Sequence, residues 1–221
     1  MKRVFCILFL AEITACSSGK GDFGGTDAAA PAIDSGAQTN ACATDTYPAG
    51  PYGTSVGMVV NPGLSWQGYL PNATSVSTIA PNDLYDCDGS KGIDAIIFDA
   101  SAAWCAACQS QAANTPQLFQ QYDALDIRVV ALIVQDQNSA PATTATAEAW
   151  KTQYGLTDIT VAADPAFSFA PPDESSVSLP VTIVVDPRSM KIMAVNQGYV
   201  AAYPLSPDPT ASSIAKKNGA P

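Results

Sequence analysis

The order of apolar segments predicts an α/β protein with a mixed central sheet flanked by helices. Several apolar, β-branched runs have the length of strands, two helical stretches separate the first three of them, and the last two runs flank a turn sequence. In chain order the expected elements are strand 95–99, helix 105–122, strand 127–134, helix 145–154, and strands 159–162, 181–185 and 191–196. Strand, helix, strand, helix and a final hairpin together predict both parallel and antiparallel neighbours in one sheet.

Each element has its own local signal. Residues 64–70 alternate as in a strand or hairpin ahead of the core. Pro116 should kink or restart the first helix because it lacks a backbone N–H, and Gly155 should end the second helix. Asp186-Pro187-Arg188-Ser189 is a turn sequence that joins the last two strands. One face of the first helix is expected to consist of Cys108, Ala112, Thr115, Phe119 and Tyr122.

Cys105 and Cys108 form a C-x-x-C pair where the 95–99 strand leads into the first helix. At a helix N-terminus the backbone dipole and free N–H groups stabilise a thiolate, so Cys105 is the candidate nucleophile and Cys108 the candidate resolving thiol. The same spacing occurs in zinc sites and in inert structural disulfides. Because the chain has no His and no second C-x-x-C, a four-ligand zinc site is hard to assemble. We predict a redox pair and no metal.

The N-terminus indicates export. A short positive stretch precedes an apolar run over 4–10 that is too short to span a bilayer, and Ile13-Thr14-Ala15-Cys16 resembles the lipobox of bacterial lipoproteins. We predict a lipoprotein signal peptide over 1–15 and lipidation of Cys16; the alternative is an ordinary secretory signal. By resemblance to lipoprotein sorting, Ser17 favours anchoring to the bacterial outer membrane, which places the protein in the cell envelope.

Composition divides the rest of the chain. Residues 16–40 are mostly Gly, Ala, Ser, Asp and Thr and predict a flexible tether. The domain is expected over 41–204, with a Pro/Gly-rich N-terminal extension at 41–91 and the core at 92–204. No long amphipathic helix is apparent near the end, so residues 205–221 are expected to be a C-terminal tail.

Charge and residue usage exclude several functions. The net charge is −10 and no basic cluster is present, which argues against nucleic acid and against electrostatic adhesion to anionic lipid. Membrane attachment would then come from the lipid anchor alone. The absence of His excludes Ser-His and Cys-His catalysis and removes the commonest metal ligand.

Two further cysteines bracket the N-terminal extension. In an oxidising compartment Cys42 and Cys87 most simply pair with each other. Such a structural disulfide would close a loop of about 45 residues and contribute about 3–4 kcal/mol in the chain-entropy model. The alternative is a second redox relay that exchanges with Cys105 and Cys108.

Three motifs in order resemble the thioredoxin superfamily, specifically the exported TlpA/ResA-like thiol–disulfide oxidoreductases. Asp99 precedes the nucleophilic Cys by six residues, and Trp104 stands immediately before that Cys. Leu179-Pro180-Val181-Thr182 resembles the family's cis-proline loop and the start of the strand that follows it. The resemblance covers residues 92–198 and implies a thioredoxin-like fold in which the proline loop lies against the two cysteines.

The resemblance also implies roles for residues around the cysteines. Asp99 would be a buried carboxylate with a raised pKa that exchanges a proton with Cys108; its alternative is a turn or helix-cap carboxylate. Trp104, Leu179 and Pro180 would bind substrate. Their alternatives are core packing for Trp104 and an ordinary trans proline that starts a strand.

Two departures from the family pattern stand out. Ala106-Ala107 replaces the family's Gly-Pro or Pro-His between the cysteines, which implies a centre less oxidising than the strongest disulfide donors. The family's final helix is expected to be short or missing.

The predicted function is an extracytoplasmic thiol–disulfide oxidoreductase that exchanges disulfides with protein substrates. It would need a redox partner protein and no small cofactor, and we expect a monomer. A peroxiredoxin-like peroxidase shares the fold but would need a Thr and an Arg around the reactive Cys, and the segment before Cys105 supplies neither. A copper-delivery protein would need a downstream His. A non-catalytic thioredoxin-fold binding module is the remaining alternative.

Overall fold

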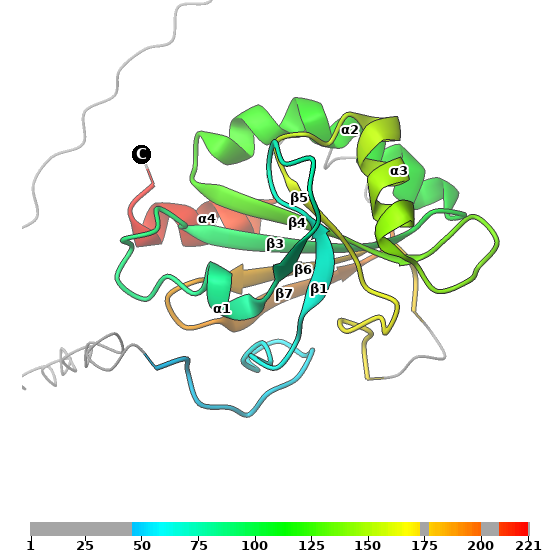
Figure 1. The fold of residues 1–221 in the computed structure, drawn as a ribbon. Helices are drawn as coiled ribbons and strands as arrows, with labels where there is room; N and C mark the ends of the chain where they lie inside the picture. Colours follow the sequence, from blue (N-terminus) through cyan, green and yellow to red (C-terminus); the bar gives the residue numbers. More distant parts are fainter. Residues whose placement is uncertain (1–45, 173–176, 200–207, 221) are drawn as a thin grey trace, which may run out of the picture. The chain divides into compact units, whose positions relative to one another are not determined.

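The computed structural model describes residues 46–172, 177–199 and 208–220 (Figure 1). The predicted signal peptide, Cys16, the tether and Cys42 lie outside the described residues, so what the sequence predicts for them stays a prediction. No helix in the described part of the chain is long and apolar enough to cross a membrane.

A seven-stranded sheet with the order β2-β1-β5-β4-β3-β6-β7 forms the centre of the fold. The strands are β1 (Trp66–Tyr69), β2 (Ser77–Ile79), β3 (Ala95–Ala102), β4 (Ile127–Gln135), β5 (Thr160–Ala163), β6 (Val181–Asp186) and β7 (Lys191–Gln197). β3, β4 and β5 are parallel to one another, and the other neighbours pair antiparallel. The predicted mixed α/β sheet is confirmed. Every residue of β3 is buried, because packed layers cover both faces of the sheet at its centre.

Three helices pack on one face of the sheet. They are α2 (Ala106–Asp123), α3 (Thr144–Tyr154) and α4 (Pro209–Asn218), while the short α1 (Pro81–Leu84) precedes β3. The crossovers β3–α2–β4 and β4–α3–β5 step in the same direction along the sheet, so right-handed connections put both helices on the same side. α4 packs on β3 and β6, and its N-cap residue Asp208 lines a pocket together with residues of α2.

An aromatic cluster fills the opposite face behind β3. Trp66 of β1, Phe98 of β3 and Phe169 from the chain after β5 lie with ring centroids 4.7–5.9 Å apart. All three side chains are almost completely buried. Ring packing of this kind adds to area burial and fixes the strand that leads to the two cysteines.

The N-terminal extension reaches both edges of the sheet. Its β1–β2 hairpin, predicted at 64–70 as a strand or hairpin, pairs with β5. A Cβ at Gly68 would collide with the backbone of β5, so this close approach requires glycine. At the other edge, the N–H groups of Gly57 and Val60 donate to the carbonyls of Ile192 and Met190 at 2.8 and 2.9 Å.

The helix boundaries agree with two sequence expectations out of three. Cys105 is the N-cap of α2, and Gly155 ends α3 with φ 64°, the left-handed conformation that favours glycine. Of the two outcomes expected at Pro116, the restart is wrong, because α2 continues through this residue, and the kink stays a prediction. Buried Ala112 and Leu118 anchor the helix to the sheet on both sides of the exposed proline.

The prediction of a tail over 205–221 is wrong for residues 209–218, which form α4. Asp208 caps this helix and accepts hydrogen bonds from the N–H groups of Thr210 and Ala211 at 2.8 and 3.0 Å. The buried face consists of Ala211, Ile214 and Ala215. Two of these three side chains are alanines, so the apolar periodicity of the helix is weak in the sequence although the face is buried in the fold.

Candidate redox site

Cys105 and Cys108 are joined by a disulfide at the start of α2. β3 ends at Ala102, and a short turn brings Cys105 to the N-cap, where its Sγ accepts a hydrogen bond from the Cys108 N–H at 3.1 Å. After reduction, the free N–H groups and the dipole at this helix end stabilise a Cys105 thiolate. The pair is therefore placed to take up two electrons as a disulfide and to return them as a dithiol.

Both cysteines are more buried than their position at a helix start predicts. The exposed fraction is 7% for Cys105 and 0% for Cys108. The loop before β6 covers Cys105, since the carbonyl oxygen of Leu179 lies 3.8 Å from its Sγ. Of the two cysteines, Cys105 still has the greater access to solvent.

Trp104 is held in place at the surface. Its side chain is 46% exposed, and its indole N–H donates to Gln135 Oε1 at 2.8 Å. The carbonyl oxygen of Ala103 accepts hydrogen bonds from Gln109 Nε2 at 2.7 Å and Gln137 Nε2 at 2.6 Å. The core-packing alternative for Trp104 is wrong, and the three glutamines were missed because side-chain amides carry no motif spacing.

The Leu179–Pro180 peptide bond is cis, which confirms the sequence expectation and excludes the trans alternative. The N–H of Gly198 donates to the carbonyl oxygens of Ser178 and Pro180 at 2.9 and 2.8 Å. The residue that follows β7 therefore fixes the position of this loop. β6 begins at the next residue, with Val181 opposite Ala100 of β3. The loop and the disulfide therefore meet where β3 ends and β6 begins.

Asp99 is a buried carboxylate in the second half of β3, towards the cysteines. Ser101 Oγ donates to its Oδ1 at 3.2 Å. Burial raises the pKa of Asp99 to about 6, against hydrogen bonds from Gln111 and Ser101 that favour the charged form. The expected burial of Asp99 is confirmed, and the turn or cap alternative is wrong because Asp99 lies within β3. The proton exchange between Asp99 and Cys108 stays a prediction.

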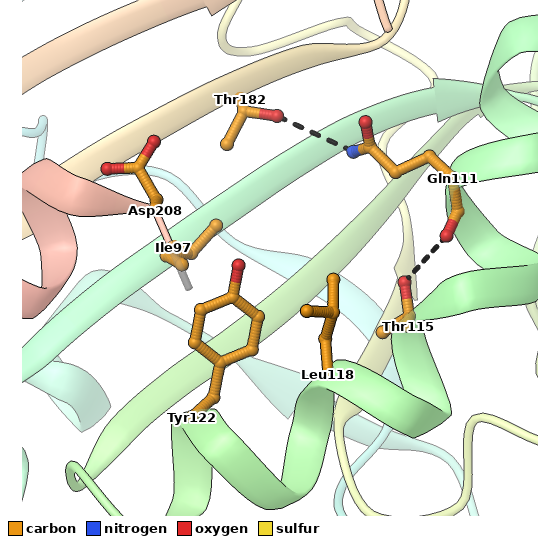
Figure 2. Close-up of a pocket in the computed structure, with 7 residues that line it drawn as sticks. All are labelled: Ile97, Gln111, Thr115, Leu118, Tyr122, Thr182 and Asp208. Atoms are coloured by element: carbon orange, nitrogen blue, oxygen red, sulfur yellow. Dashed lines mark hydrogen bonds between the residues drawn. The ribbon is translucent and has the colours of Figure 1, made fainter. Parts of the chain in front are cut away.

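Two polar residues beside Asp99 were not predicted as site residues from the sequence. Thr182 of β6 is the cross-strand partner of Asp99. Gln111 lies three residues after Cys108 on α2, and its Nε2 is 3.5 Å from Thr182 Oγ1. Figure 2 draws this contact as a dashed line. The spacing i, i+3 from a buried helix residue indicates the same helix face and could have singled out Gln111.

The described residues contain few groups that could bind a metal ion or activate a peroxide. They contain no group of three or more His, Cys, Asp or Glu side chains that could hold a metal ion. Their two arginines lie away from the disulfide: Arg128 is at the start of β4, and Arg188 pairs with Asp86 and Asp94 before β3. The described part of the chain therefore puts no arginine beside Cys105 of the kind that a peroxiredoxin-like site needs.

Cys87 is disulfide-bonded. Its predicted partner, Cys42, lies outside the described residues, so the pairing of the two stays a prediction.

Comparison with known proteins places this arrangement in a fold class. No family model and no curated protein sequence matches the chain. A solved structure of an uncharacterised conserved protein from Geobacillus kaustophilus matches with a TM-score of 0.51 and 13% identity, over 76% of this chain and 86% of that one. The reduced 2-Cys peroxiredoxin of Plasmodium vivax matches with a TM-score of 0.50 and 14% identity, over 67% and 75% of the two chains.

A thioredoxin-family thiol:disulfide interchange protein from Chlorobium tepidum also matches, with a TM-score of 0.47 and 16% identity over 71% of this chain and 94% of that one. At these identities the two matches with TM-scores of 0.51 and 0.50 define the fold and leave the activity open. The chain has a thioredoxin-like fold, as the three sequence motifs predict.

Proposed function

We propose that this protein is a thiol–disulfide oxidoreductase of the TlpA/ResA-like kind that exchanges disulfides with protein substrates. One observation carries the proposal: the Cys105–Cys108 disulfide caps α2 directly against the cis-proline loop, with the Leu179 carbonyl 3.8 Å from Cys105 Sγ. A disulfide that served only stability would gain nothing from a helix N-terminus that favours the thiolate.

The exchange proceeds through a mixed disulfide. The Cys105 thiolate attacks one sulfur of a substrate disulfide, the substrate S–S bond breaks, and the other substrate sulfur leaves as a thiolate. The Cys108 thiolate then attacks Cys105 Sγ, which releases the second substrate sulfur and re-forms the Cys105–Cys108 disulfide. The substrate gains two electrons and the protein loses two, and a redox partner protein returns the pair to the dithiol.

Asp99 acts as the base for the second attack. Burial raises its pKa to about 6, so it is mostly ionised at neutral pH and still basic enough to take the Cys108 proton. Trp104 and the Leu179–Pro180 loop would hold the substrate chain on either side of Cys105, because the indole is exposed and the loop carbonyl faces the sulfur.

Reduction of insulin by dithiothreitol tests the activity. The wild-type protein should accelerate the reaction, Cys105→Ser should abolish the acceleration, and Cys108→Ser should accumulate a mixed disulfide with insulin. Gln117→Ser, an exposed change on the same helix, serves as the control and should retain the wild-type rate. A wild-type protein without effect on insulin would overturn the proposal and leave a binding module, and turnover of hydrogen peroxide would favour the peroxidase.

Alkylation tests the assignment of the two thiols. The reduced protein should be labelled first at Cys105, because Cys108 is completely buried and Cys105 lies at the helix N-terminus. Mass spectrometry of digests after brief labelling at mildly acidic pH gives the order. Equal or preferential labelling of Cys108 would reverse the roles.

We also propose that the protein works outside the cytoplasm, lipid-anchored through Cys16. The lipobox-like Ile13-Thr14-Ala15-Cys16 supports this proposal. Metabolic labelling with an alkyne fatty acid should tag the wild-type protein and leave Cys16→Ala untagged.

In exported protein, a non-reduced digest should contain the Cys42–Cys87 linked peptide, and free thiols at both positions would refute that pairing.

A further inference from the structure

Trp104 presents a large apolar surface to solvent directly beside the reactive cysteine. Its side chain is 46% exposed, whereas the other two tryptophans of the chain, Trp66 and Trp150, are 2% and 3% exposed. An exposed indole leaves much apolar area in contact with water, so a molecule that covers it gains free energy from burial. The core does not account for Trp104, and its place next to Cys105 indicates a contact with substrate.

The described side chains that flank Cys105 are uncharged and mostly apolar. Trp104 and Ala106, the residues on either side of Cys105 in the chain, are exposed, and Ala107 is partly exposed. Across from them, the cis-proline loop brings the partly exposed Leu179 against the sulfur. The surface around the reactive sulfur therefore favours an apolar segment of substrate.

Gln135 fixes both the indole and the backbone that carries it. Its Oε1 accepts the indole N–H of Trp104 at 2.8 Å, and its carbonyl oxygen accepts the N–H of Ala103 at 2.9 Å. Gln135 is the last residue of β4, opposite Ala102 at the end of β3. One residue at the end of a central strand thus sets the direction of the exposed ring.

The residue before Trp104 is also held from a second side. The carbonyl oxygen of Ala103 accepts hydrogen bonds from Gln109 Nε2 at 2.7 Å and from Gln137 Nε2 at 2.6 Å. Gln109 belongs to α2 and Gln137 to the chain after β4, so the two donors reach this buried backbone group from different elements. The turn between β3 and Cys105 is therefore fixed at both its N–H and its carbonyl group.

The 135–141 loop that supplies Gln135 and Gln137 is itself well ordered by hydrogen bonds. Asp136 Oδ1 accepts the N–H groups of Asn138 and Ala140 at 2.8 and 2.9 Å. The Asp136 N–H donates to the Ala140 carbonyl at 2.8 Å. The carboxylate of Asp136 bonds within this loop, and the two glutamines are the side chains that bond to the redox turn.

We propose that the Trp104 indole binds a large apolar side chain beside the substrate cysteine, and that Gln135 is the positioning residue that holds the indole for this contact. The inference rests on the proposed disulfide exchange and names the class of substrate: a protein segment with a large apolar residue next to its disulfide. Gln109 and Gln137 act one step earlier, because they fix the backbone residue that precedes Trp104.

The exchange reaction determines where such a segment lies. In the mixed disulfide the substrate sulfur is bonded to Cys105, and consecutive Cα atoms in a chain are only about 3.8 Å apart. A side chain next to the substrate cysteine is therefore within reach of Trp104. An indole that is already held in one orientation loses little rotational freedom when the segment binds, so it binds more tightly than a mobile ring would.

Two peptide disulfides that carry either Leu or Ser beside the cysteine test the substrate class. The wild-type protein should reduce the Leu peptide about three- to tenfold faster than the Ser peptide, and Trp104→Ala should remove this preference. Hydroxyethyl disulfide, which has no side chain, should react equally with both proteins. Equal rates with the two peptides in the wild type would overturn the inference alone, whereas no reaction with any of the three disulfides would overturn the proposed function.

Gln135→Met tests positioning, because it keeps the length of the side chain and removes the acceptor for the indole N–H. In turnover of the Leu peptide with dithiothreitol, KM should rise about three- to tenfold and kcat should keep its wild-type value. Gln135→Glu retains an acceptor oxygen and should restore the wild-type KM. Gln117→Met, the same change at an exposed position of α2, is the control. A folded Gln135→Met protein with the wild-type KM, or failure of Gln135→Glu to restore it, would overturn the role of Gln135.

The two donors to the Ala103 carbonyl are tested as a pair. Gln109→Met or Gln137→Met alone leaves one hydrogen bond on this carbonyl and should change KM little. The double variant leaves the buried carbonyl without these donors and should raise KM by more than the product of the two single effects. Independent effects would contradict a shared role. All these variants should reduce hydroxyethyl disulfide at the wild-type rate, and a loss of that rate would mean damage to the cysteines, which contradicts positioning of the indole.

Discussion

The two ends of β3 hold buried carboxylates in opposite electrostatic settings. Before the strand begins, Asp86 and Asp94 share the guanidinium of Arg188, which lies 3.1 Å from Asp86 Oδ2 and also donates to Asp94 Oδ1. Near the other end, Asp99 has only neutral hydrogen-bond donors. The same residue type is therefore paired at one end and unpaired at the other.

The paired end acts as a clamp on the fold. Arg188 also donates to the backbone carbonyls of Asp86 and Ile93 at 2.7 and 2.8 Å, while the Asp86 carboxylate accepts the N–H groups of Lys91 and Ile93 at 3.1 and 2.9 Å. Charge and hydrogen bonds are matched here, so the arrangement stabilises the connection between the N-terminal extension and the β6–β7 turn.

The end of β3 that holds the unpaired Asp99 is suited to proton transfer. A buried carboxylate without a cation destabilises its own charged form, and this brings the pKa of Asp99 to about 6, close to neutral pH. Burial alone therefore does not distinguish a structural carboxylate from a functional one. What distinguishes the two ends is whether a fixed positive charge accompanies the acid.

The largest effect is expected at the clamp. Arg188→Met leaves two buried carboxylates unpaired and should lower the free energy of unfolding by about 3–4 kcal/mol. Arg128→Met is the matched control, because Arg128 meets Asp123 only at 3.9 Å on the surface, and it should cost no more than about 1 kcal/mol. Urea denaturation measures both, and equal losses would contradict the distinction between the two arginines.

Asp99→Asn should raise the free energy of unfolding, and the size of this gain should depend on pH. The pKa of Asp99 is raised from 3.8 to about 6 in the folded protein, so wild-type stability from this group is present at low pH and is lost as pH rises from about 4 to about 6. Asn lacks this titration, so the variant should gain about 3 kcal/mol over the wild type at pH 7.5 and little at pH 4. A gain of the same size at both pH values would contradict an unpaired acid.

A smaller loss is expected where α4 meets the clamp. Asn218 Nδ2 donates to the Asp94 carbonyl at 2.9 Å and to Asp186 Oδ1 at 3.1 Å. Asn218→Ala should therefore lower the free energy of unfolding by about 1–2 kcal/mol. Ser213→Ala on the exposed side of α4 provides the control. If the two variants proved equally stable, α4 would contribute nothing to the clamp.

The parts of the fold that sequence predicts carry a local pattern or an ordered motif. β-branched runs mark the central strands, and the C-x-x-C pair, Asp99 and Pro180 are recognisable together because their order along the chain is specific. α4 has a weak apolar face, although Asp208-Pro209 is a cap followed by proline at the first helical position, a signal that could have located it.

The remaining features depend on contacts between distant residues. The sequence 186–189 indicates a turn, and nothing local predicts that Arg188 reaches back 94 residues to Asp94. Likewise, Gln111 and Thr182 are 71 residues apart and meet only when α2 packs on the sheet. Uncharged polar residues are frequent in this chain, so the sequence alone does not indicate which of them pair in the folded structure.

Resolution of a mixed disulfide at Cys105 tests the central claim most directly. The protein can be loaded with a chromogenic thiol at acid pH and then jumped to pH 6–9, where release of the thiol reports attack by Cys108. Asp99→Asn should slow this release about tenfold to a hundredfold at pH 7, whereas Asp186→Asn, a buried carboxylate at the clamp end, should release the thiol at the wild-type rate. Unchanged release by Asp99→Asn across pH 6–9 would contradict the account and make Asp99 a structural residue like those at the other end of β3.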